Sequence, residues 1–107
     1  MSVCIIYQVK PEFIREYGFR RLAAIEKDFG DDGLPREAWA EVYRFEQAET
    51  GELIVFLESL YIRFNENRPA DFTGHSLSVS DIVETPSGLF FCDSLGWKPV
   101  KWKEAQV

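Results

Sequence analysis

Side chains that bind soft metals are scarce, because the chain of 107 residues has only two cysteines and one histidine. Cys4 and Cys92 each lie in an apolar segment, and no Cys-x-x-Cys pair occurs. We therefore predict buried free thiols, with a disulfide as the alternative if two strands bring the cysteines together. A structural zinc site usually takes four ligands, and two cysteines with His75 fall short of that number, so we expect no metal.

Long apolar runs are absent as well. Nowhere do about 18 apolar residues follow one another, as a membrane-spanning helix requires. The run from Val3 to Val9 has no basic residues before it and meets Lys10 and Pro11 at once, unlike a signal peptide. We therefore expect a cytoplasmic protein with no membrane partner.

Basic residues are too few to balance the acidic ones: 12 Lys and Arg stand against 18 Asp and Glu, a formal net charge of −6. This disfavours nucleic acid as a partner, because binding to a phosphate backbone depends on Lys and Arg displacing counterions. Residues 26 to 58, the acidic block, hold ten of the acids and three bases. We interpret the block as a solvated face; a patch for a basic partner and partial mimicry of nucleic acid are the alternatives.

Motifs that hold cofactors are missing too. The sequence has no glycine-rich phosphate loop followed by Lys and Ser or Thr, no Gly-x-Gly-x-x-Gly, no His-x-x-x-His and no acidic calcium loop. We expect no cofactor.

Apolar residues, in contrast, are plentiful. Hydrophobic side chains make up 46% of the chain and aromatic ones 15%, which is enough to offset the entropy of ordering it. The length fits one core, so we predict a single domain over residues 1–107.

Two strands are predicted in the first half. The segment from Val3 to Val9 is rich in β-branched and aromatic residues and predicts a central strand buried on both faces. From residue 39 to residue 46, alternation places Trp39, Tyr43 and Phe45 on one face of a second strand.

Two helices are predicted as well. An apolar stripe runs from Phe19 to Phe29 and ends at Gly30, where a left-handed C-cap is easiest. The second helix has the clearer period, with Thr50 available as its cap. Its apolar positions are Leu53, Phe56, Leu57, Leu60, Tyr61 and Phe64.

The last third of the chain predicts a hairpin, with strands over residues 78–85 and 89–92 around Pro86-Ser87-Gly88. Residues 97–102 predict one more short strand, and Pro99 indicates an edge. Because a hairpin replaces a βαβ repeat, we predict an α+β fold: a small, mainly antiparallel sheet with two helices packed on one face.

Two blocks of sequence resemble the YodL-like domain family. The first, LESLYIRFNENRPADFTGHSLSVSDIV, covers residues 57–83 and contains the GHSLSVSD motif; the second, FFCDSLGWKPV, covers residues 90–100. Tyr7-Gln8 and EYGFRRL at residues 16–22 match more loosely. The resemblance implies a bacterial context, in phages or conjugative elements, and carries no known activity or catalytic residues with it.

Polar residues gather on both sides of the predicted hairpin. His75 is followed by Ser80 and Asp81, and Asp93 and Ser94 follow the second strand. A serine, a histidine and a carboxylate are the groups that nucleophilic catalysis needs, which makes His75, Ser80, Asp81 and Asp93 candidate catalytic residues. No Gly-x-Ser-x-Gly elbow is present, and Ser and Asp near turns commonly bond the local backbone, so we favour a structural role.

Three functions are compatible with these patterns. The one we favour is a non-enzymatic protein-interaction module of a mobile genetic element or its bacterial host. Its predicted binding residues are His75, Asp81, Asp93, Ser94 and Trp97. The first alternative is a small hydrolase or transferase with His75 as the base.

The second alternative is a module for single-stranded nucleic acid. Trp97, Lys98, Lys101, Trp102 and Lys103 would suit stacking on bases with phosphate contacts nearby. The same residues suit an edge strand guarded by lysines and packed by tryptophan, which is the interpretation we favour.

Overall fold

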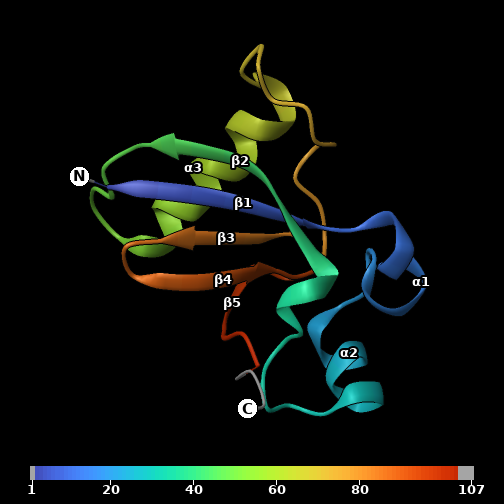
Figure 1. Cartoon of the computed structure of the whole chain (residues 1–107). Coiled ribbons are helices and arrows are strands. Elements are labelled where there is room, and N and C mark those ends of the chain that lie inside the picture. The colour runs from blue at the N-terminus through green and yellow to red at the C-terminus, as the bar shows by residue number, and fades with distance from the viewer. Residues whose placement is uncertain (1, 104–107) are drawn as a thin grey trace.

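The computed structural model describes residues 2–103, which form an antiparallel sheet flanked by helices (Figure 1). The strand order is β2-β1-β3-β4-β5, and every neighbouring pair is antiparallel. With η marking a 3-10 helix, the elements are β1 (Val3–Val9), η1 (Pro11–Phe13), α1 (Ile14–Tyr17), α2 (Leu22–Phe29), η2 (Arg36–Ala38), β2 (Trp39–Glu46), α3 (Leu53–Glu66), β3 (Ile82–Thr85), β4 (Gly88–Cys92) and β5 (Trp97–Val100). The predicted α+β class and antiparallel sheet are confirmed.

Strand β1 lies inside the sheet between β2 and β3, as its sequence predicts. Successive side chains of a strand point to opposite faces. Cys4 and Ile6 therefore join one apolar cluster, while Ile5 and Tyr7 join another on the opposite face. A strand that is apolar on both faces needs cover on both sides of the sheet.

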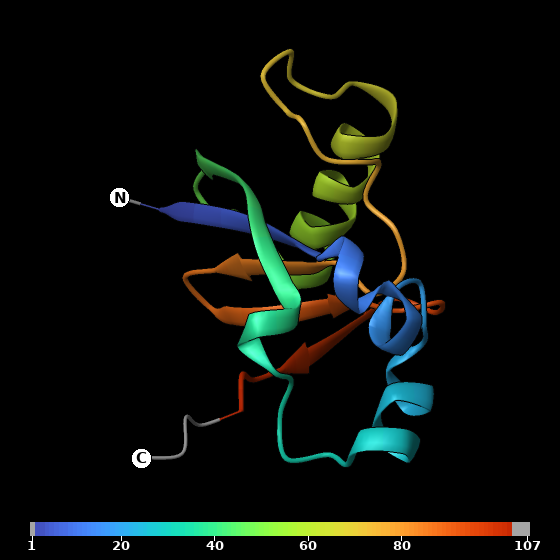
Figure 2. The same cartoon turned by 45° about the vertical axis from the view of Figure 1, so that its right-hand side comes forward.

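The helices supply that cover from two sides. The buried face of α3 packs on the cluster around Cys4 and consists of Phe56, Leu57, Leu60 and Phe64. The opposite cluster takes Tyr17 from α1 and Ile25 from α2. This differs from the predicted arrangement of two helices on one face, and α2 lies well apart from α3 in both views (Figures 1 and 2).

A β-bulge in β2 changes which residues share a face. Ile6 pairs with Tyr43 and Tyr7 pairs with Glu41, so Val42 has no partner in the ladder. One extra residue reverses the alternation beyond it. Trp39 consequently lies in one apolar cluster and Tyr43 packs against the other, whereas strict alternation predicted one face for both.

The ends of the helices follow local backbone geometry. Helix α2 begins at Leu22 rather than Phe19, because Phe19 has a left-handed φ of 58°. It ends before Gly30, as predicted, and φ is positive there at 92°; ψ is 174°, so the cap is extended rather than the predicted left-handed one. Helix α3 has Glu52 at its N-cap with no side-chain hydrogen bond, so the prediction of Thr50 as its cap is wrong.

The second half contains the predicted hairpin of β3 and β4, although β3 begins at Ile82 rather than at residue 78. Strand β5 pairs with β4 at the edge of the sheet, and Pro99 lies in it as expected. Trp102 lies beyond β5 and forms a parallel bridge with Leu34. Cys4 and Cys92 are buried and free, so the alternative of a disulfide is excluded.

Candidate functional site

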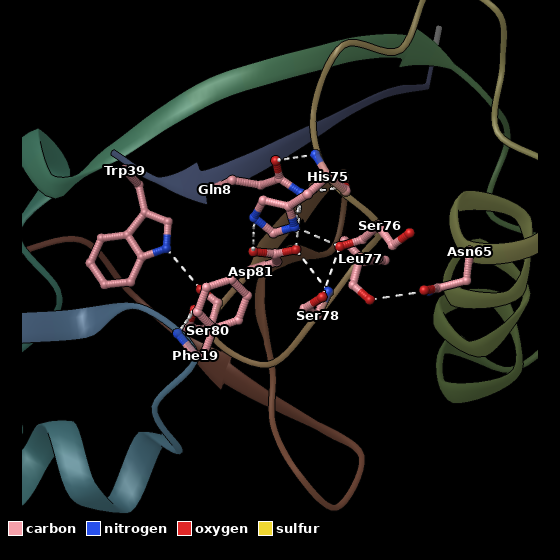
Figure 3. A network of polar contacts seen from close by, with 10 residues as sticks. All are labelled: Gln8, Phe19, Trp39, Asn65, His75, Ser76, Leu77, Ser78, Ser80 and Asp81. Carbon is pink, nitrogen blue, oxygen red and sulfur yellow. Dashed lines mark hydrogen bonds and ion pairs between the residues drawn. The ribbon is translucent and has the colours of Figure 1, made fainter. Parts of the chain in front are cut away.

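Gln8 at the end of β1 holds the loop that carries His75 (Figure 3). Its side-chain Nε2 donates to the His75 carbonyl oxygen at 2.8 Å, and its Oε1 accepts from the His75 backbone N–H at 3.2 Å. The Gln8 side-chain amide thus donates to and accepts from the backbone of one residue, as the backbone of a neighbouring strand does. A Cβ atom at Gly74 would lie 2.5 Å from Oε1, so the contact requires glycine there.

Asp81 lies directly under this clamp and is 1% exposed. Its Oδ2 accepts from the Ser78 backbone N–H at 2.8 Å and from Gln8 Nε2 at 3.1 Å. Burial raises the pKa of Asp81 to about 8, and the two donors oppose that rise because they favour the charged form. A carboxyl group deep in the fold therefore titrates close to neutral pH.

The ring of His75 is half exposed, and its Nε2 lies 3.9 Å from Asp81 Oδ1. Its Nδ1 lies 2.7 Å from the Ser76 carbonyl oxygen. The Ser76 carbonyl only accepts, so this shorter contact needs a proton on Nδ1, whereas the Gln8 Nε2 amide, 3.3 Å from the same nitrogen, would need Nδ1 as an acceptor. Among the described residues no serine hydroxyl bonds to the ring, so the arrangement contains no serine–histidine pair of the kind that nucleophilic catalysis uses.

Ser80 connects three distant segments. Its Oγ accepts from the Phe19 backbone N–H at 2.8 Å, its carbonyl oxygen accepts from Trp39 Nε1 at 2.8 Å, and its own N–H donates to the Cys92 carbonyl oxygen at 2.9 Å. Ser80 has a φ of 83°, an uncommon value for a residue other than glycine. These three bonds hold the strained residue in place.

Asp93, Ser94 and Trp97 lie at a different place, around the turn between β4 and β5. They line a surface hollow of about 210 Å³ between this turn and α3. The remaining lining residues are Glu58, Tyr61, Val79, Cys92 and Gly96. The predicted site residues thus fall into two groups: His75, Ser80 and Asp81 in the polar network, and Asp93, Ser94 and Trp97 at the hollow.

The outward face of α3 carries four exposed apolar residues, of which the sequence analysis named only Tyr61, as part of the predicted apolar face of the helix. Ile54 is 47% exposed, Val55 61%, Ile62 55% and Tyr61 38%. Their spacing of i, i+1, i+7 and i+8 places them on one side of the helix, with Glu58 between them. We call these four residues the α3 apolar stripe. The sequence did contain a sign of this stripe. The run LIVFL at residues 53–57 is apolar throughout, and the predicted buried face of the helix accounts for only three of its five residues.

Comparison with known protein families bears on the whole chain. A family model described as the YodL-like domain matches residues 3–102. The chain belongs to the YodL-like domain family. The match includes the first half, where the sequence resemblance was loose, as well as both motif blocks of the second half. A search of the curated proteins and a search of the solved structures each found no match.

In this YodL-like domain the tryptophans of the last described segment, Trp97 and Trp102, pack against the rest of the fold. The ring of Trp102 lies 5.3 Å from that of Tyr7 and 6.0 Å from that of Trp39, and the Arg36 guanidinium lies 5.3 Å from Trp102. Trp97 packs against the cluster under α3. The contacts of Trp102 occupy a ring that base stacking would need, which favours the edge-strand interpretation of this segment.

A second hollow of about 330 Å³ lies between α2, the loop that follows it and β5. None of the predicted site residues lines it, and His75 lines neither of the two hollows. Within residues 2–103 no cluster of three or more His, Cys, Asp or Glu is placed to hold a metal ion. In the same part of the chain, no helix has both the length and the apolar character needed to cross a membrane.

Proposed function

We propose that this YodL-like domain is a non-enzymatic protein-interaction module of a mobile genetic element or its bacterial host. The binding surface is the α3 apolar stripe together with the turn between β4 and β5. The observation that carries this proposal is the exposure of four large apolar side chains on one side of a single helix. Large apolar side chains grouped in the open on one face are a mark of interaction sites in soluble proteins.

Charge indicates which partner fits this surface. Glu58 lies between the residues of the stripe, and Asp93 lies on the adjoining turn. Glu58 also belongs to the acidic block, for which a basic partner was one interpretation. A partner segment with apolar residues and at least one basic side chain would complement both features.

The polar network supports this role indirectly. Gln8, Asp81 and Ser80 hold the loop from Gly74 to Asp81 against the sheet. The Ser80 N–H donates to the carbonyl oxygen of Cys92, a residue that lines the hollow. The loop also supplies Val79 to the hollow. A rigid support of this kind lowers the entropy lost when a surface binds its partner.

The first experiment identifies the partner by position. A photo-crosslinking amino acid is placed at residue 62 in the stripe and, as the matched control, at residue 14, where Ile14 is 44% exposed on α1. We expect a host protein that is captured at position 62 and not at position 14. Capture at neither position, or equally at both, contradicts the proposal.

The second experiment uses the purified partner. Burial of each apolar side chain at an interface contributes roughly 1 to 2 kcal/mol, so Val55→Ser with Ile62→Ser should weaken binding at least about tenfold. Ile14→Ser is the control and should leave the affinity unchanged. His75→Ala should also bind normally; if instead it abolishes a turnover while the protein stays folded, the enzyme hypothesis replaces this one.

A further inference from the structure

The hollow beside α3 has the size of a site for one side chain. Its volume of about 210 Å³ is below the roughly 300 to 1,000 Å³ of pockets for small-molecule ligands. It opens at the surface between Tyr61 of α3 and the turn that carries Asp93 and Trp97. Tyr61 belongs to both the hollow and the α3 apolar stripe, so a partner lying on the stripe reaches the hollow without a gap.

Two carboxylates line the hollow, and no Lys or Arg stands among its described lining residues. Asp93 is oriented through Oδ1, which accepts from the Ser94 backbone N–H at 2.8 Å and from the Leu22 N–H at the start of α2 at 3.4 Å, so Oδ2 is the oxygen left for a partner. For Glu58, residues 2–103 offer no hydrogen bond or ion pair within bonding distance. Neither carboxylate is therefore neutralised by a basic group of this part of the chain.

Cys92 also lines the hollow, and the pKa of its thiol responds to the negative charge of the carboxylates around it. Burial and the nearby carboxylates of Asp81, Glu58 and Asp93 raise the pKa of Cys92 to about 12. Since negative charge disfavours a thiolate, it favours a cation brought to the same place.

The aromatic lining distinguishes between the two basic side chains. Tyr61 and Trp97 both line the hollow. A guanidinium group pairs with carboxylates through a planar fork of donors and also stacks on aromatic faces, whereas an ammonium is a compact and strongly hydrated charge. An arginine side chain therefore matches the lining better than a lysine side chain.

We propose that the hollow formed by Glu58, Tyr61, Asp93 and Trp97 binds an arginine side chain of the partner protein. This inference rests on the proposed function. The guanidinium lies between the Glu58 and Asp93 carboxylates and against the aromatic rings, and apolar residues next to the arginine in the partner cover the α3 apolar stripe.

The test uses the whole chain, labelled with ¹⁵N, and three small probes followed by NMR. The probes are N-acetyl-arginine amide, the corresponding lysine derivative and the corresponding citrulline derivative, which keeps the shape of arginine without its charge. We expect saturable shifts for the Trp97 indole N–H and the Gly96 amide with the arginine probe. The lysine probe should bind more weakly and the citrulline probe should produce no saturable shift.

Variants separate the site from general charge effects. Glu58→Gln should weaken the arginine probe about threefold or more, as expected for loss of one exposed ion pair, and Asp93→Asn should act in the same direction. Glu66→Gln, at the end of the same helix and outside the hollow, is the matched control. Equal shifts with arginine and citrulline, or equal losses in Glu58→Gln and Glu66→Gln, overturn the inference.

The outcomes also distinguish this inference from the function on which it rests. If a partner crosslinked at residue 62 binds Glu58→Gln as tightly as the parent chain, the arginine site is wrong and the interaction module stands. If the arginine probe binds as expected but residue 62 captures no partner, the hollow is a cation site and the interaction module is wrong.

Discussion

Replacing Asp81 by asparagine should remove a large dependence of stability on pH. The side chain is 1% exposed, and burial raises its pKa from the ordinary 3.8 to about 8. The folded protein therefore keeps the Asp81 proton up to pH of about 8, while the unfolded chain releases it above 3.8. A group whose folded pKa is raised stabilises the fold fully at pH values below the unfolded pKa. That stability is lost as the pH rises through the folded pKa.

The magnitude follows from the difference in bound protons. Between pH 5 and 7 the folded state holds one proton more at Asp81 than the unfolded state. The free energy of unfolding then falls by up to about 1.4 kcal/mol for each pH unit, or up to about 3 kcal/mol over this interval. Asp81→Asn keeps the shape of the protonated carboxyl and its acceptor for the Ser78 N–H, but does not titrate.

The pH window separates Asp81 from the other groups with shifted pKa values. The pKa values of Glu41 and Glu49 lie below their ordinary value of 4.5. These two groups therefore change the stability only at pH values below about 5. The pKa values of Tyr7 and Cys92 rise to about 12, from ordinary values of 10.0 and 9.0, so their effect begins above pH 8. Cys4, Tyr17, Tyr43 and Arg44 have pKa values raised from 9.0 or higher, so they also act above pH 8. Within residues 2–103, Asp81 is the shifted group that remains between pH 5 and 8.

Urea unfolding followed by tryptophan fluorescence at pH 5, 6, 7 and 8 measures the effect. We expect the parent chain to lose stability steadily across this series and Asp81→Asn to lose much less. His75→Asn is the matched control, because it changes the residue that faces Asp81 across 3.9 Å and leaves the Asp81 carboxyl in place; it should retain the slope of the parent chain. A flat profile for the parent chain, or the same slope in Asp81→Asn, refutes the reasoning.

Three further predictions concern the same region. Ser80→Ala leaves the Phe19 N–H without its acceptor and should lower stability by about 1 to 2 kcal/mol, measured by calorimetry; an unchanged melting temperature would show that water replaces the hydroxyl. Gly74→Ala brings a Cβ atom to 2.5 Å from Gln8 Oε1, so hydrogen exchange at residue 75 should accelerate, and unchanged protection would contradict the clamp. Cys92 is buried with a raised pKa, so a thiol reagent at pH 8 should modify it only after unfolding, and rapid labelling of the folded protein would contradict this burial.

Periodic apolar patterns predicted the main elements of the fold. The spacing of Leu57, Leu60 and Phe64 predicted α3, and the apolar run of β1 predicted a strand inside the sheet. These patterns predict the elements because the buried residues of a helix or strand recur with the period of that helix or strand. The bulge at Val42 was not predictable from the pattern, because one unpaired residue leaves no compositional mark and depends on the partner strand.

Sequence proximity also explains how much of the site was predictable. His75 and Asp81 are six positions apart, and the sequence analysis placed them together, as the structure does. Gln8 is 67 residues from His75, and only folding brings its amide to the loop. The α3 apolar stripe was missed because a helix that is apolar on more than one side looks in sequence like a helix with one wide buried face.

The sequence by itself determined the class of the protein and its family. Strand and helix periodicity and the hairpin turn depend on residues that are neighbours in sequence, and the net charge is a sum over the chain. The family follows from the GHSLSVSD and FFCDSLGWKPV blocks, which stand in the sequence itself. The tertiary structure alone decided which apolar side chains of α3 stay exposed and that Asp93 and Trp97 line one hollow with Glu58. It also decided that Asp81 is enclosed beneath Gln8. Exposure and charge environment depend on what packs against a residue from elsewhere in the chain, and that information is absent from local spacing.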